Sequence, residues 1–273
     1  MKQRTFHLPL MLIALSLLTS CRQYTTTYFE NRLGDLRRKA FGIPWNPFIR
    51  YGALTDARDG HTYRTVKIGH QTWMAENLNY KIANSSCGGN SEDSCIKYGR
   101  FYEWEVAMNI AHVIPKVPLH LIDSPFPPRY RWGGPDSLHQ GICPEGWHLP
   151  TYTEWEQLIT CIKKDSTALR KDSLATIQLT SLRGWPIEIF RRKILNDFNG
   201  TDTYGFRALP AGEMSYGTIP GNGGSAGFWS ATEVNGGFGE YAWIYFIGLY
   251  RYVNHMDAYK SSGHSVRCVE DPM

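Results

Sequence analysis

Cys143-Pro-Glu-Gly-Trp-His-Leu-Pro-Thr-Tyr-Thr-Glu-Trp-Glu156 is the stretch that decides the fold of this chain. It places a cysteine and a tryptophan directly before the start of a helix. Thr151 and Thr153 are each followed three residues later by a glutamate, which is the capping-box pattern of a helix N-terminus. The next apolar residues fall on one helical face: Trp155, Leu158, Ile159 and Ile162. We therefore predict an amphipathic helix that begins at one of the two threonines.

The residues before this stretch predict a β-hairpin and a further helix. Two β-rich runs at 62–68 and 71–74 are joined by Gly69-His70, a short link typical of a hairpin. From 101 to 111, apolar residues recur at every fourth position, which predicts a helix.

After the capped helix the pattern changes from helices to strands. Residues 174–185 are weakly helical in pattern, whereas strand-like runs lie at 228–232, 241–247 and 265–269 in a Gly-rich background. Helices early in the chain and strands late in it indicate an α+β fold.

The N-terminus predicts a lipoprotein signal peptide at residues 1–20. Two basic residues precede an apolar run that is shorter than the roughly 20 residues needed to span a bilayer. The run ends in Leu18-Thr19-Ser20-Cys21, which resembles a bacterial lipobox. That resemblance implies that Cys21 becomes the first mature residue and carries lipid chains that anchor the protein in a membrane. The next residue is Arg22 rather than Asp, which implies delivery to the outer membrane of a bacterial cell envelope.

The mature chain is predicted to consist of a tether and one domain. Residues 21–55 are expected to form the tether, with a short basic helix at 31–41, and residues 56–270 the domain. Removing Lys2 and Arg4 from the 29 basic residues leaves 27 against 25 acidic residues, a balance that argues against a nucleic-acid partner.

Two further features of the domain concern its loops and its aromatic content. A Pro-rich insertion at 112–142 interrupts the domain and is either a functional loop or a mobile insertion. An aromatic content of 14% is high, so aromatic side chains are expected both in the core and on the surface.

Six cysteines become five once Cys21 carries lipid. In an exported protein the others are expected to form disulfides. Cys87 and Cys95 flank a polar loop that a short bridge can close, and Cys143 with Cys268 would close a much longer one. Cys161 is then the odd cysteine, expected to be a thiol on the flank of the capped helix. A metal site is the alternative, but the chain lacks the CxxC spacing and the Cys and His clusters that such a site requires.

Ordered motifs along the domain resemble the Fibrobacter succinogenes major paralogous domain. The opening motif is DGHTYRTVKIGHQTWMAENL at 59–78. It is followed by YGRFY at 98–102, the stretch from Gly141 to Trp155, GFRALPAG at 205–212, FWSATE at 228–233 and SVRCV at 265–269. The family is bacterial and is often secreted or lipid-anchored. The resemblance implies the same setting for this chain.

That family is in turn similar to the C-type-lectin-like fold, which is shared with formylglycine-generating enzymes. The resemblance implies two main helices, short antiparallel strands and long loops. Those enzymes use a pair of cysteines near the C-terminal end to bind copper, and this chain has only Cys268 there. Calcium-dependent lectins use Glu-Pro-Asn or Gln-Pro-Asp, and neither tripeptide occurs. An oxygen-rich run containing Asp197, Asn199 and Asp202 is a weaker calcium candidate.

We therefore expect a non-catalytic domain without a metal or another cofactor. Gly223-Gly224-Ser225-Ala226-Gly227 matches a nucleophile-elbow pattern but precedes a strand-like run rather than a helix. His148 is expected to form hydrogen bonds in the core.

The remaining function is binding through aromatic side chains, to a polysaccharide or to an envelope protein. Tyr130, Trp132, Tyr250 and Tyr252 are the candidate ligand-binding residues. Tyr241, Trp243 and Tyr245 alternate along a predicted strand and are interpreted mainly as core residues. A structural envelope lipoprotein without a small ligand is the alternative, and an oxidoreductase of the formylglycine-generating type is the third possibility.

Overall fold

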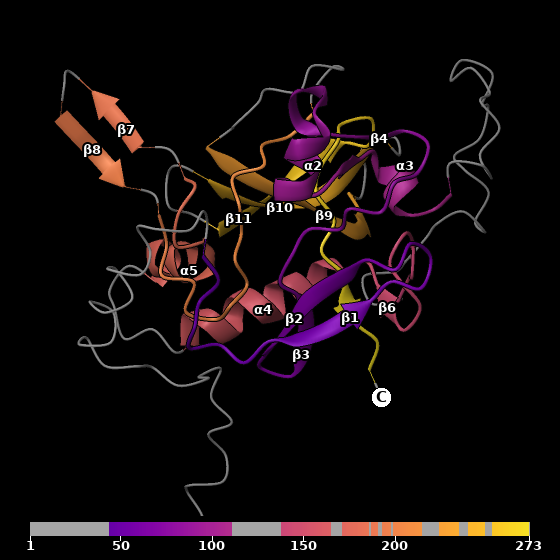
Figure 1. The fold of residues 1–273 in the computed structure, drawn as a ribbon, viewed down its shortest axis with the longest axis horizontal. Coiled ribbons are helices and arrows are strands. Elements are labelled where there is room, and N and C mark those ends of the chain that lie inside the picture. The colour runs from indigo at the N-terminus through magenta and orange to yellow at the C-terminus, as the bar shows by residue number, and fades with distance from the viewer. Residues whose placement is uncertain are drawn as a thin grey trace, which may run out of the picture.

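The structure is a computed structural model, and it describes part of the chain of 273 residues. The described residues are 44–110, 138–164, 171–185, 187–190, 193–197, 199–214, 224–234, 240–248 and 253–272. They form a mixed α/β fold of mostly antiparallel strands with few helices (Figure 1). The mixed class expected from the sequence is confirmed.

The largest sheet has five strands and joins the beginning of the fold to its end. In spatial order the strands are β1 (Gly52–Thr55), β2 (Thr62–Ile68), β3 (Gln71–Met74), β12 (Val269–Glu270) and β6 (Trp147–His148). All neighbouring pairs are antiparallel. The predicted hairpin at 62–68 and 71–74 is confirmed as β2 and β3, with Gly69 at the turn in a left-handed conformation.

A second sheet has three antiparallel strands. Its order is β11 (Val253–Tyr259), β10 (Tyr241–Gly248) and β9 (Ser225–Glu233). The strands predicted at 228–232 and 241–247 are confirmed within β9 and β10. Because the side chains of a strand alternate, Tyr241, Trp243 and Tyr245 share one face of β10.

The smaller elements are short strands and short helices. They are β4 (Ser85–Ser86), the 3-10 turn η1 (Gly88–Asn90), α2 (Glu92–Tyr98), β5 (Phe101–Tyr102), α3 (Trp104–Ala107), β7 (Ile187–Phe190) and β8 (Lys193–Asp197). The β7–β8 hairpin projects from the body of the protein at the upper left of Figure 1.

Helix α4 (Tyr152–Lys164) begins as its capping box predicts. Thr151 is the capping residue: the Glu154 backbone N–H donates to its Oγ1 at 3.2 Å, and the Thr151 backbone N–H donates to Glu154 Oε2 at 2.8 Å. The predicted apolar face is buried: Trp155, Leu158, Ile159 and Ile162.

The other two predicted helices differ from the structure. Helix α5 (Lys171–Leu179) ends before the predicted limit of 185, because Thr180 pairs with Ala208 instead of continuing the helix. The helix predicted at 101–111 is wrong except for α3. Phe101 and Tyr102 form β5 against β4, and a left-handed Asn109 ends the helical path.

The C-terminal segment 263–270 is held by elements from all over the fold. The Tyr102 backbone N–H donates to the His264 carbonyl at 3.0 Å, and Leu78 and Met74 donate to Val266 and Cys268. Regular strand geometry is limited to β12, so the strand predicted at 265–269 is mostly an extended strip with isolated pairings.

The core consists of two clusters of buried side chains. One surrounds α4 and includes Trp73, Trp155, Phe206, Phe228 and Tyr245. The other surrounds the disulfide of Cys143 and Cys268 and includes Tyr102, Trp104, Trp147 and Trp229.

The folded body begins earlier than residue 56. Strand β1 pairs with β2, and Ile49 lies in the first core cluster, so residues 44–55 belong to the fold rather than to the predicted tether. The leader at 1–20, the helix predicted at 31–41 and most of the Pro-rich insertion lie outside the described residues. The last part of that insertion is packed, because Ile142 is buried and its N–H donates to the Ala107 carbonyl at 2.8 Å.

Candidate functional site

Several of the predicted functional residues fall where the structure gives no placement. Cys21, Tyr130, Trp132, Tyr250 and Tyr252 lie outside the described residues. Their roles stay predictions.

The two predicted disulfides are present. Cys87 is bonded to Cys95, and Cys143 to Cys268 with both residues fully buried. The prediction of a thiol at Cys161 is wrong, because this cysteine is also disulfide-bonded in the structure. The prediction assigned every other cysteine either to lipid or to a disulfide, which left no partner for Cys161.

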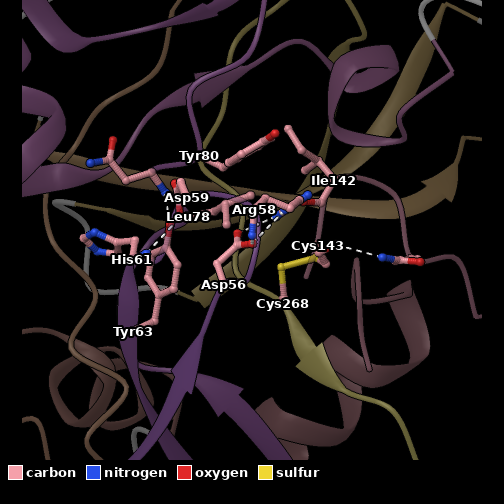
Figure 2. Close-up of polar contacts among 12 residues, drawn as sticks. Asp56, Arg58, Asp59, His61, Tyr63, Leu78, Tyr80, Ile142, Cys143 and Cys268 are labelled. Carbon is pink, nitrogen blue, oxygen red and sulfur yellow. Dashed lines mark hydrogen bonds and ion pairs between the residues drawn. A yellow bond between two sulfur atoms is a disulfide. The ribbon is translucent and has the colours of Figure 1, made fainter. Parts of the chain in front are cut away.

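Asp56 and Arg58 form a clamp beside the Cys143–Cys268 disulfide (Figure 2). Arg58 donates from Nε to Asp56 Oδ1 at 2.8 Å and from Nη2 to Oδ2 at 2.6 Å. Its Nη1 donates to the Ile142 carbonyl at 2.8 Å, and its guanidinium lies 4.0 Å from the ring centroid of Tyr80.

The clamp holds the turn between β1 and β2 against the residue that precedes Cys143. Burial would raise the pKa of Asp56, but the hydrogen bonds from Arg58 outweigh it and lower that pKa below its usual range. Asp56 and the Ile142 carbonyl together accept hydrogen bonds from all three nitrogens of the guanidinium. We therefore interpret the clamp as a structural feature and not as a ligand site.

His148 has the core hydrogen-bonding role that the sequence predicts. Its Nε2 lies 2.8 Å from Glu154 Oε1, and its Nδ1 lies 2.7 Å from Asp271 Oδ1. Burial would lower the pKa of His148, but its two carboxylate partners raise it above its usual value. Glu154 therefore caps α4 and also binds the imidazole, which fixes the helix start to β6.

The oxygen-rich loop considered for calcium is engaged by protein groups. Asp202 is fully buried; its Oδ1 accepts the Arg207 backbone N–H at 2.7 Å, and its Oδ2 accepts the Tyr51 hydroxyl at 3.4 Å. Burial raises the pKa of Asp202 to about 8, so this group is largely neutral at pH 7. Asn199 Oδ1 accepts the Trp185 backbone N–H. Calcium prefers charged oxygen ligands, so these two residues do not fit it.

A cluster of half-exposed rings lies where α4 begins beside β10 and β11. We call it the aromatic face, and its members are Tyr152, Tyr241, Trp243, His255 and Tyr259. The ring centroids of Tyr152 lie 5.6 Å from Trp243 and 5.0 Å from His255, and those of Trp243 and His255 lie 5.2 Å apart. These three rings therefore form one contiguous group.

Buried contacts hold the Tyr152 end of the aromatic face in place. Tyr152 donates its backbone N–H to Thr232 Oγ1 at 3.0 Å and accepts the Tyr245 hydroxyl on its carbonyl at 3.2 Å. The same hydroxyl is 2.7 Å from Glu156 Oε1, which in turn lies 3.4 Å from His255 Nδ1. The buried Tyr245 thus connects the start of α4 to the sheet.

The other end of the aromatic face is a cross-strand pair. Tyr241 and Tyr259 are directly opposite in register, and their ring centroids are 4.5 Å apart. A hydrogen bond to Tyr259 raises the pKa of Tyr241 to about 12. Between the two ends, Trp243 is opposite the exposed Asp257.

The aromatic face combines exposed ring area with hydroxyl and carboxylate oxygens. Rings of this kind bind flat apolar surfaces such as the faces of sugars, while the oxygens accept hydrogen bonds from hydroxyl groups. The sequence indicated the alternation on β10, but not Tyr152 or His255. The only signal for Tyr152 was its position directly after the capping threonine.

A metal site is less well supported. Among the described residues, one group has metal-ligand spacing, namely Cys87, Glu92 and Cys95. Both of its cysteines are bonded to each other, and a disulfide sulfur is not the thiolate that a metal ion needs. Within the described ranges, no helix has both the length and the apolar character required to cross a membrane.

Comparison with known proteins identifies a family. No curated protein and no solved structure matches the chain. Residues 66–270, which hold β3, the capped helix and every strand of the second sheet, match the sequence model of the Fibrobacter succinogenes major domain. The chain therefore belongs to the Fibrobacter succinogenes major domain family.

Proposed function

We propose that this chain is a lipid-anchored protein of the bacterial cell envelope that binds polysaccharide through the aromatic face. The observation that carries the proposal is the contiguous group of half-exposed rings of Tyr152, Trp243 and His255. Surface aromatic rings usually pack singly. A rigidly supported group with adjacent carboxylates is typical of a binding surface.

The fold in this proposal is C-type-lectin-like. The arrangement in which β12 from the end of the chain lies beside the first hairpin, with α4 and α5 as the main helices, supports it. The proposed activity is binding and not catalysis, because His148 and Asp202 are each committed to structural partners. An envelope protein as ligand, and a purely structural lipoprotein, are the alternatives.

Trp243→Ala tests the binding surface. We expect affinity for the polysaccharide that the wild-type protein binds to fall about tenfold or more, because the largest ring of the group is removed. Affinity is measured by titration calorimetry against soluble neutral polysaccharides, and folding is checked by thermal unfolding.

Phe48→Ala is the matched control, since Phe48 is an aromatic residue that is 40% exposed outside the aromatic face. Unchanged affinity in the Trp243 variant would contradict this surface. Absence of binding to every polysaccharide would favour the structural lipoprotein.

Cys21→Ala tests the anchor. The lipidated protein partitions into a detergent phase, whereas the variant is expected in the aqueous phase. Aqueous partitioning of the wild type would rule the anchor out.

A further inference from the structure

Acidic groups border the aromatic face. Asp257 is exposed and lies directly opposite Trp243 in the β10–β11 register. Glu156 contacts His255 and the Tyr245 hydroxyl at the other end. Glu240 and Asp257 also act on Tyr241 as negative charges that raise its pKa, after its hydrogen bond to Tyr259, the effect of burial and the charge of Tyr259.

The rings of the aromatic face are open to an external cation. Arginine and lysine side chains lie over other rings in the described part of the chain: Trp45, Tyr80, Tyr98, Trp104, Phe206 and Phe228. None of these described contacts involves the aromatic face. Its π surfaces therefore keep their negative potential, to which the carboxylates of Asp257 and Glu156 add.

The spacing suits a chain of sugars rather than a single one. Tyr241 and Trp243 are two residues apart on one strand, which corresponds to about 7 Å, and the ring centroids of Tyr152 and His255 lie 5.6 and 5.2 Å from that of Trp243. Asp257 is the register partner of Trp243, so the side chains of the two residues leave the same face of the sheet. A positive group on a central sugar would therefore meet a ring and a carboxylate together.

We propose that the ligand of the aromatic face is a glycan that carries protonated amino groups, with Asp257 and Trp243 as the ammonium subsite. This inference rests on the proposed polysaccharide binding and specifies its chemical class. An ammonium group is attracted both by the ring and by the carboxylate, so its binding is the most favourable. A neutral acetamido sugar binds only through stacking on the ring, and the negative charge of a uronate is repelled by the carboxylate.

The experiment compares three soluble oligosaccharides of matched length: glucosamine oligomers, N-acetylglucosamine oligomers and polyuronate oligomers. At pH 6 and low salt, the glucosamine oligomers are expected to bind about three- to tenfold more tightly than the acetylated ones, and the uronates most weakly. Asp257→Asn should remove most of this preference, because the amide keeps a hydrogen-bond acceptor but carries no charge. Glu145→Gln, at an exposed acidic position outside the aromatic face, is the charge-matched control and should behave as wild type.

The outcomes separate the two proposals. Equal affinity for amino and acetylated oligomers, or tighter uronate binding, overturns the ammonium subsite but leaves polysaccharide binding intact. Retention of the amino preference in the Asp257 variant also overturns the subsite. If no oligosaccharide binds, or if Trp243→Ala binds all of them normally, both proposals fail.

Discussion

Arg267 shows how one side chain can organise a core. It is fully buried and donates to Asn77 Oδ1 at 2.7 Å, to the carbonyl of Met74 at 3.2 Å and to that of Arg207 at 3.1 Å, with a further bond to the Phe206 carbonyl. Its guanidinium also lies 4.5 Å from the ring centroid of Phe206. Burial lowers its pKa to about 9, so it stays charged at neutral pH and needs all these partners.

Arg267→Lys should therefore destabilise the protein by about 3 kcal/mol, because an ammonium group cannot reach the same set of acceptors in a planar arrangement. Urea unfolding measures the loss. Arg50→Lys is the control: Arg50 is exposed, and its replacement should change stability by less than about 0.5 kcal/mol. Equal effects of the two variants would show that the Arg267 contacts are not stabilising.

His264 is a buried histidine whose two ring nitrogens have no hydrogen-bond partner among the described residues. Its ring lies edge-on to Trp229 at 4.6 Å. A side chain at Gly227 would meet its Nδ1 at 2.7 Å, so a glycine is needed there. Burial lowers the pKa of His264 to about 3.

This shift makes stability depend on pH. Between the unfolded pKa near 6.5 and the folded value near 3, the unfolded chain binds a proton that the folded chain excludes. Stability from this group is therefore complete above pH 6.5 and falls as pH falls, by up to about 1.4 kcal/mol for each pH unit. Urea midpoints measured between pH 4 and pH 7 should fall less steeply in His264→Phe than in wild type. The exposed His70→Phe should keep the wild-type slope, and parallel profiles for all three proteins would disprove the assignment.

At the scale of elements, the start of α4 is the best-specified feature. Thr151, Glu154 and His148 form a continuous hydrogen-bonded set that fixes the helix to β6. Tyr152 follows the cap directly, so the cap also sets the position of the aromatic face.

Thr151→Ala should cost about 1 kcal/mol, because the helix loses the side-chain acceptor of its first turn. Thr153→Ala is the matched control. Thr153 lies inside the helix, and alanine is the better helix former there, so its stability should be equal or slightly higher. Thermal unfolding of the two variants decides which threonine is the cap, and a larger loss at Thr153 would contradict the structure.

Local patterns predicted elements well where the signal lay within one segment. The capping box and the β2–β3 hairpin are examples, since each depends on residues a few positions apart. The segment 101–111 failed because its partners are distant: Tyr102 pairs with Ser85 and with His264, and no local spacing encodes either contact. The apolar residues at every fourth position in this segment are buried, but they lie in a strand and a turn as well as in a helix.

The candidate site was only half predictable for the same reason. Alternation on β10 placed Tyr241 and Trp243 on one face, but their exposure depends on which side chains of α4 and β11 pack beside them. Tyr152 and His255 come from those other elements, and their proximity follows from the packing of α4 on the sheet.

At the scale of the whole molecule, the two described disulfides restrict very different lengths of chain. Cys87 and Cys95 are 8 residues apart, whereas Cys143 and Cys268 are 125 residues apart. The longer loop encloses α4, α5 and the second sheet.

Replacing each pair by serine should reveal this difference. In the chain-entropy model, loss of Cys143–Cys268 costs about 5 kcal/mol and loss of Cys87–Cys95 about 2.5 kcal/mol. Each variant serves as the control for the other in urea unfolding. Equal losses would indicate that strain or residual structure, and not loop length, determines their effect.

The position of the segment 263–270 has a consequence for how the protein is made. β12 lies inside the five-stranded sheet, between β3 and β6, although it follows every other described element in the sequence. The sheet therefore cannot close, and Arg267 and Cys268 cannot meet their partners, while the ribosome is still adding the first 260 residues. A chain that stays open until residues 263–270 have been added completes its core only after they have been synthesised.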